Sequence, residues 1–216
     1  MVIIQTNIRK IRELGESWYT PGANTVFYIK WDWSITDTWP NQINFTTQNL
    51  SFATEWDLTY IVFNNWANGF YTTSVNIPCP FTFNLWMYQT WWTYAPRLLD
   101  NTDSNDNAIQ ITTSSSNPYT IKSYNTSTTI TGNTRINLVV TWDTSWNCKI
   151  YKQWVLSSTW TSRTNSATGI IVWYKKSNSL DNFRWRMSKI ILESKVRTAE
   201  ETSDYYDQTK SDYGIS

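Results

Sequence analysis

Short apolar runs, each closed by a polar turn, recur along the whole chain. The runs alternate with a period of two or are continuously apolar, and they are rich in β-branched and aromatic residues, which predicts β-strands. The expected strands are 26–30, 58–64, 70–73, 81–88, 109–113, 119–124, 135–142, 148–153, 155–158, 169–174 and 186–193. Strands this short and numerous favour an all-β fold of two packed antiparallel sheets.

Two segments depart from this pattern, one at each end of the chain. Thr198 followed by Glu201 fits a capping box, so a helix of two to three turns is predicted over 199–208. The alternation in "TNIRKIREL", within residues 1–20, fits an extra edge strand or an arm that docks on a neighbouring subunit.

Size and charge limit the classes of function. A chain of 216 residues suits one all-β domain, and its net charge of +1 with 16% charged residues leaves no basic stripe for nucleic acid. The sequence contains 0 His, so the commonest general base and zinc ligand is missing. We therefore expect a protein that is not an enzyme and has no nucleic-acid partner.

The N-terminus and the body of the chain suggest different compartments. The start "MVIIQTNIRKIRELGES" places its charges after its apolar residues, the reverse of a Sec signal peptide, and no apolar run is long enough for a membrane span. The body, rich in Thr, Ser, Asn and aromatics, is typical of extracellular β-sandwiches. A virion or an extracellular surface assembly would reconcile the two. Cys79 and Cys148 fit either one disulfide or two buried thiols.

Five stretches resemble the LamG-like jelly rolls of the concanavalin A-like lectin and glucanase superfamily. They are "FTFNLWMY" (81–88), "INLVVTWDTSWNCKIYKQWVL" (136–156), "GIIVWY" (169–174), "FRWRMSKIILES" (183–194) and "RTAEETSDYY" (197–206). The resemblance implies a jelly-roll domain over 21–209, preceded by the arm 1–20 and followed by a tail 210–216. It also implies that Asp143, after its strand, forms a turn. Superfamily members differ in function, so the resemblance implies the fold more firmly than the activity.

Tryptophan repeatedly stands where the LamG-like pattern has glycine. Trp154, Trp173 and Trp185 are the clearest cases, and Trp33 and Trp39 fall in turn contexts. The chain has 15 Trp against 6 Gly, which inverts ordinary usage. Trp86 and Trp142, in contrast, occupy positions where the family has aromatic residues.

A non-glycine residue at positive φ costs roughly 1–2 kcal/mol, so many such sites would strain a domain that is stable by only ~5–15 kcal/mol. We hypothesise that most of these tryptophans are native glycines, encoded by UGA under an alternative genetic code as used by some bacteria and their phages. The hypothesis predicts that Trp33, Trp39, Trp154 and Trp185 lie at turns of positive φ or at close backbone approaches. A code that truly reads UGA as Trp, or a surface rich in stacking aromatics, are the alternatives.

Two loops are candidate binding sites. In "QTWWTYAPR" (89–97), Trp91, Trp92 and Tyr94 could stack on a sugar, although Trp91 and Trp92 could equally be a Gly-Gly turn without a ligand. In "LLDNTDSNDNAI" (98–109) the oxygen-bearing side chains could bind Ca²⁺, although a solvated polar turn is the simpler interpretation. The four candidate metal ligands are Asp100, Asp103, Asn105 and Asp106.

The related glucanases carry a Glu-x-Asp-x-Glu type of strand motif, and the sequence contains no such strand. We therefore expect a non-enzymatic, surface-exposed binding or adhesion module, with a glycan or another cell-surface polymer as its ligand. The alternative is a structural virion component, a phage decoration or tail-fibre domain without a small ligand, which contacts other subunits through residues 1–20.

Overall fold

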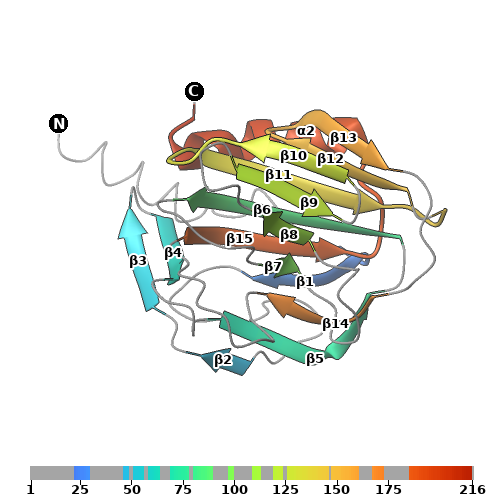
Figure 1. The fold of residues 1–216 in the computed structure, drawn as a ribbon, viewed down its shortest axis with the longest axis horizontal. Coiled ribbons are helices and arrows are strands. Elements are labelled where there is room, and N and C mark those ends of the chain that lie inside the picture. Colours follow the sequence, from blue (N-terminus) through green and yellow to red (C-terminus); the bar gives the residue numbers. More distant parts are fainter. Residues whose placement is uncertain are drawn as a thin grey trace.

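An eight-stranded antiparallel sheet forms the first layer of the protein (Figure 1). The computed structural model describes residues 22–29, 46–48, 51–55, 58–63, 69–77, 80–89, 97–99, 109–112, 119–123, 126–145, 147–160, 167–172 and 185–215. The strand order is β13-β12-β11-β6-β15-β4-β3, and β1 also pairs with β15. Its strands are β1 (Thr25–Ile29), β3 (Ser51–Glu55), β4 (Leu58–Phe63), β6 (Phe81–Gln89), β11 (Arg135–Trp142), β12 (Cys148–Lys152), β13 (Val155–Trp160) and β15 (Trp185–Glu193).

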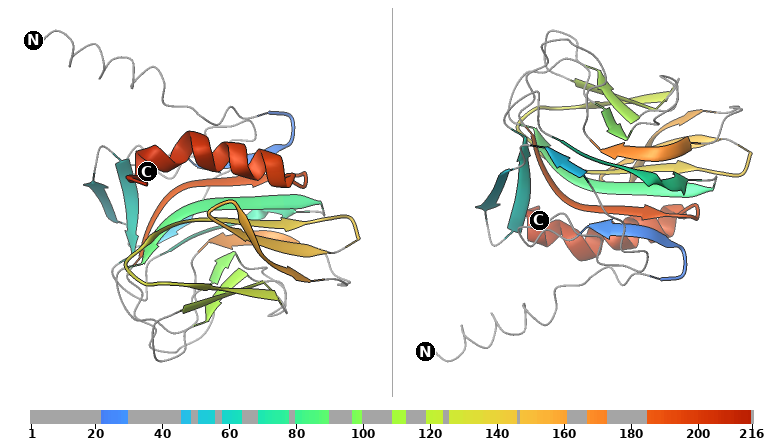
Figure 2. Two further views of the ribbon diagram at one scale, coloured as in Figure 1. Left: turned by 90° about the horizontal axis from the view of Figure 1, so that it is seen from above. Right: turned by 90° about the horizontal axis from the view of Figure 1, so that it is seen from below.

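The second layer consists of two smaller antiparallel sheets. One has the order β10-β9-β8-β7 and the other β14-β5-β2, and β14 lies beside β7. Their strands are β2 (Thr46–Gln48), β5 (Gly69–Ile77), β7 (Arg97–Leu99), β8 (Ile109–Thr112), β9 (Tyr119–Ser123), β10 (Thr126–Ile130) and β14 (Ala167–Val172). Figure 2 shows β7, β8 and β9 on one side of the large sheet and helix α2 (Ala199–Thr209) on the other. The antiparallel β-sandwich with a short C-terminal helix is thus confirmed, and its second layer is divided into two sheets.

Strands β6 and β11 form the centre of the large sheet, and both of their faces are buried. Their register pairs Phe83 with Val140 and Leu85 with Leu138, so these side chains share the face toward the second layer. At the end of this row Phe81 stacks on Trp142, with ring centroids 6.2 Å apart. A strand that packs on the second layer with one face and on a helix with the other buries both faces. Its sequence is therefore a nearly continuous hydrophobic run, as in 135–142.

The opposite face of the same strands carries an aromatic cluster under α2. Trp86 is 0% exposed and stacks on Tyr213 at a centroid distance of 4.0 Å and on Tyr206 at 5.7 Å. Its indole Nε1 donates a hydrogen bond to Thr209 Oγ1 at 3.2 Å. We call Trp86, Tyr206, Thr209 and Tyr213 the Trp86 cluster. Tyr213 belongs to the 3₁₀ helix η1 (Lys210–Tyr213), so the residues after 209 take part in this packing.

The predicted strands agree with the observed ones to within a few residues. The helix begins as expected, because Thr198 and Glu201 form both hydrogen bonds of a capping box. Strands β2, β3, β7 and β10 were not predicted, since each is short or rich in Thr and Ser and lacks an apolar run. Residues 1–20 lie outside the described part of the chain.

Asp143 closes the turn between β11 and β12, as expected. Its Oδ1 accepts hydrogen bonds from the backbone N–H groups of Ser145, at 2.8 Å, and Asn147, at 2.9 Å. Partial burial opposes ionisation of this carboxyl, but the hydrogen bonds from Asn147 and Ser145 outweigh it and lower the pKa of Asp143.

The turn between β12 and β13 contains two residues of positive φ. Gln153 has a φ of 48° and Trp154 a φ of 63°, which confirms the expectation for Trp154. Trp185 instead begins strand β15, where it pairs with Phe63 and Gln89, so the expectation of a turn there was wrong. Trp33, Trp39 and Trp173 lie outside the described residues. Cys148 is buried in β12 and Cys79 lies outside the described residues, so the disulfide and the two buried thiols both stay as alternatives.

Candidate functional site

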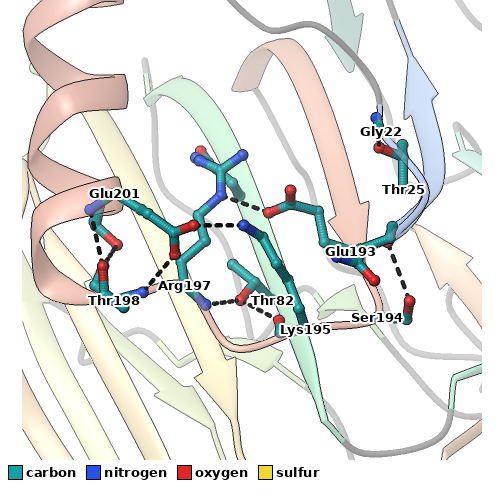
Figure 3. Close-up of polar contacts among 12 residues, drawn as sticks. Gly22, Thr25, Thr82, Glu193, Ser194, Lys195, Arg197, Thr198 and Glu201 are labelled. Carbon is teal, nitrogen blue, oxygen red and sulfur yellow. Dashed lines mark hydrogen bonds and ion pairs between the residues drawn. The ribbon is translucent and has the colours of Figure 1, made fainter.

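A cleft of about 430 Å³ opens between α2, the start of β1 and the end of β15. We call it the α2 cleft, and Figure 3 shows the polar contacts in and around it. Its wall is formed by Gly22, Ala23, Asn24, Thr25, Glu193, Lys195, Arg197, Glu201, Asp204, Tyr205 and Gln208. Residues 22–25 and residues 193–208, which are far apart in the sequence, therefore supply one surface.

Hydrogen bonds to backbone groups hold these segments together. Ser194 N–H donates to the carbonyl of Asn24 at 2.7 Å, which ties the start of β1 to the end of β15. Thr82, on β6, donates its hydroxyl to the carbonyl of Lys195 at 2.7 Å and accepts from the N–H of Arg197 at 2.9 Å. One buried threonine thus fixes the path of the chain between β15 and α2, and with it the wall of the cleft.

A buried ion pair forms the floor of the cleft. Arg197 Nε lies 2.5 Å from Glu193 Oε2, and the two side chains are 5% and 6% exposed. The Arg197 guanidinium also lies 4.8 Å from the centre of the Tyr205 ring. The ion pair and the cation–π contact together fix the orientations of Glu193, Arg197 and Tyr205.

The rim of the cleft carries a second ion pair at the start of α2. Lys195 Nζ lies 2.6 Å from Glu201 Oε1, and Glu201 Oε2 accepts from the backbone N–H of Thr198 at 2.8 Å. The hydrogen bond from Lys195, reinforced by that from Thr198, lowers the pKa of Glu201 below its ordinary value. Glu201 is therefore ionised at neutral pH and shared between the helix cap and the cleft.

The cleft presents polar side chains to a ligand. Two of its carboxylates, Glu193 and Glu201, form ion pairs with Arg197 and Lys195. Asp204 and Gln208 line the cleft with hydrogen-bonding side chains, whereas Tyr205 is 5% exposed and its hydroxyl is buried. This combination matches a ligand that carries many hydroxyl groups.

None of the site residues expected from sequence is among the described residues. Trp91, Trp92 and Tyr94, and the candidate ligands Asp100, Asp103, Asn105 and Asp106, all fall outside the described residues, so both sites stay predictions. Within the described ranges, no cluster of three or more acidic, Cys or His side chains is arranged to hold a metal. Sequence reasoning missed the α2 cleft, because its wall combines segments that give no shared motif, and the capping box was the one signal nearby.

Comparison with known proteins supports the fold. No protein-family model matches the sequence, and no curated protein sequence matches it. Among solved structures, the binding domain of Paraclostridial Mosquitocidal Protein 1 matches 85% of this chain and 52% of its own, with a TM-score of 0.67 at 14% identity. The receptor-binding domain of botulinum neurotoxin C/D mosaic serotype matches 85% of this chain and 51% of its own, with a TM-score of 0.66 at 11% identity.

An enzyme also appears among the similar structures. Trypanosoma rangeli sialidase, solved in complex with sialic acid, covers 88% of this chain and 34% of its own, with a TM-score of 0.65 at 10% identity. The chain thus spans about half of the binding domains that it matches, and a smaller share of the sialidase. At these identities the likeness establishes a β-sandwich fold and leaves activity to the site itself. None of the described helices has the length and apolar character that a membrane crossing needs.

Proposed function

We propose that this chain is a non-enzymatic glycan-binding module of the LamG-like kind, exposed on a cell or particle surface. The similar structures support this proposal, because they include receptor-binding domains and a botulinum neurotoxin type C structure described in terms of two ganglioside molecules. Another is a neurotoxin binding domain in complex with a sialylated ligand. These descriptions concern those proteins, and they suggest the ligand class to test here.

The α2 cleft is the proposed binding site. Its two cations pair with Glu193 and Glu201, and the third carboxylate, Asp204, and the amide of Gln208 add polar groups outside these two ion pairs. A neutral or weakly charged saccharide could bind there through its hydroxyl groups without leaving a buried charge unpaired, whereas a strongly charged ligand would disturb the pairs.

Matched substitutions on α2 provide the test. Asp204 lines the cleft, whereas Asp207, one turn along the same helix, lies outside the lining and pairs with Lys210. We expect saturable binding to members of a panel of neutral and sialylated oligosaccharides, measured by calorimetry. Asp204→Asn together with Gln208→Ala should weaken it by about tenfold or more, the loss expected when hydrogen bonds to a ligand are removed. Asp207→Asn should leave the affinity unchanged.

The two loop sites predicted from sequence are separate parts of the proposal. If Trp91, Trp92 and Tyr94 form a stacking platform, alanine substitutions there should abolish saccharide binding while substitutions in the α2 cleft do not. If Asp100, Asp103, Asn105 and Asp106 bind Ca²⁺, binding or stability should fall on chelation and recover on adding Ca²⁺. Chelation without effect would remove calcium from the proposal.

A purely structural role on a virion is the alternative outcome. In that case no saccharide in the panel binds saturably, and the chain assembles with other copies through residues 1–20. Sedimentation of the full chain and of a chain lacking residues 1–20 tests whether the arm causes assembly. Calorimetry on the same two chains tests the binding function, because a glycan-binding module keeps its saccharide affinity without the arm.

A further inference from the structure

The β12–β13 hairpin turns through two residues of left-handed backbone. Lys152 pairs with Val155 across the turn, and the two residues between them, Gln153 and Trp154, have φ values of 48° and 63°. Two-residue turns with positive φ at both positions match the right-handed twist of the strands, and they favour Asn-Gly, Asp-Gly or Gly-Gly. The backbone of this hairpin therefore favours glycine at its second turn position, residue 154.

Tryptophan at position 154 has a strained backbone, and its indole has little burial to offset that strain. A residue with a Cβ is strained in the left-handed region, and bulky residues are rare there. Burial could offset that cost, but Trp154 is 46% exposed, and it is followed by Val155 at 53% and Leu156 at 48%. Among the described residues these three are the large hydrophobic side chains left exposed, and they are consecutive.

The other two tryptophans whose side chains are described are in the opposite situation. Trp86 is enclosed by the Trp86 cluster, and Trp142 is 3% exposed and stacked on Phe81. Both lie in regular strands, Trp86 in β6 and Trp142 in β11, with extended backbone that any residue adopts. The indoles of Trp86 and Trp142 thus pack in the core, whereas Trp154 occupies a backbone conformation that favours glycine.

We propose that position 154 is glycine in the protein as its source organism makes it, because a UGA codon at this position is read as glycine there. Tryptophan and glycine are both meanings that UGA takes in different genetic codes, so translating a glycine UGA codon under a code that reads UGA as tryptophan would place tryptophan at that position. The proposal accounts for the local strain at 154, and it agrees in direction with the excess of 15 Trp over 6 Gly in the chain. It also removes the indole from the exposed apolar stretch at the hairpin tip.

Buried indoles provide an internal control within the same protein. Codons that encode Trp86 and Trp142 should be UGG, because glycine there would empty sites that are fully packed. The proposal therefore sorts the tryptophans by environment rather than reassigning all of them.

The test is peptide mass spectrometry on the protein purified from its native source. Trypsin cleavage after Lys152 and Arg163 releases peptide 153–163, which contains position 154, and cleavage after Arg135 and Lys149 releases peptide 136–149, which contains Trp142. Fragment ions assign each position separately. The expected result is glycine at 154 and tryptophan at 142 in the same digest.

Two results would overturn the proposal. Tryptophan at 154 in the native peptide contradicts it directly, whatever the codon. A UGG codon at 154 in the gene does so as well, because UGG is not the reassigned codon. Neither result depends on whether a saccharide binds, so this proposal and the proposed function fail independently.

Discussion

The Trp86 cluster and the β12–β13 hairpin use the same amino acid in opposite ways. Trp86 is fully buried, stacks on two tyrosines and donates a hydrogen bond from its indole. Trp154 occupies a turn at a φ of 63° with nearly half of its surface in water. Tryptophan stabilises a fold only where its area and its N–H group both find partners, and its presence in a sequence does not say which case applies.

Trp86→Ala should have the largest effect on stability, since it removes the centre of the packing between the large sheet and α2. Truncation of a buried aromatic costs about 3–5 kcal/mol, so the free energy of unfolding in urea should fall by that amount. Loss of helix signal in circular dichroism should accompany it, because Tyr206 and Tyr213 lose their stacking partner. A cost below about 1 kcal/mol would mean that the cluster does not hold α2.

Arg197→Met should have the second-largest effect on stability, because it leaves the Glu193 carboxylate buried without its cation. Breaking a buried ion pair from one side costs about 3 kcal/mol or more. The double variant Arg197→Met with Glu193→Gln should recover part of the loss, since the buried negative charge is then gone. Equal stability of the single and double variants in urea unfolding would show that the ion pair does not anchor the cleft.

The fold could be predicted from sequence where one strand carries its own signal. The run 135–142 is buried along its length and was bounded correctly, and the Thr198 and Glu201 pair marked the start of α2. Strands such as β10, "TSTTI", owe their existence to pairing with a neighbour, which composition does not reveal. The α2 cleft was invisible for the same reason, because Asn24, Thr82 and Arg197 meet only after the sheet has formed.

The stability of the helix start should depend on pH through Glu201. Its pKa is lowered in the folded protein from an ordinary value of 4.5, so the ionised form contributes stability above about that pH. That contribution is lost as the pH falls through the lower, folded-state pKa. Urea unfolding of Glu201→Gln should therefore show a smaller loss of stability on acidification than the parent, and parallel curves for the two proteins would contradict the assignment.

Asn133→Gly should have the smallest effect, and it calibrates the cost of left-handed backbone in this protein. Asn133, in the turn between β10 and β11, has a φ of 59°, close to that of Trp154. Asparagine tolerates this region, so replacing it by glycine should change the free energy of unfolding by no more than about 0.5 kcal/mol. A gain as large as that expected at position 154 would indicate that φ alone, and not the indole, sets the cost.

The most direct test compares one substitution, Trp→Gly, at positions 154 and 142 in the recombinant protein. Urea unfolding should show Trp154→Gly to be more stable than the parent by about 1 kcal/mol, because glycine adopts the turn without strain. Trp142→Gly should be less stable by about 3 kcal/mol or more, because it empties a packed site beside Phe81. If Trp154→Gly instead destabilises the protein, the exposed indole is a native part of the hairpin and the contrast between the two kinds of tryptophan is wrong.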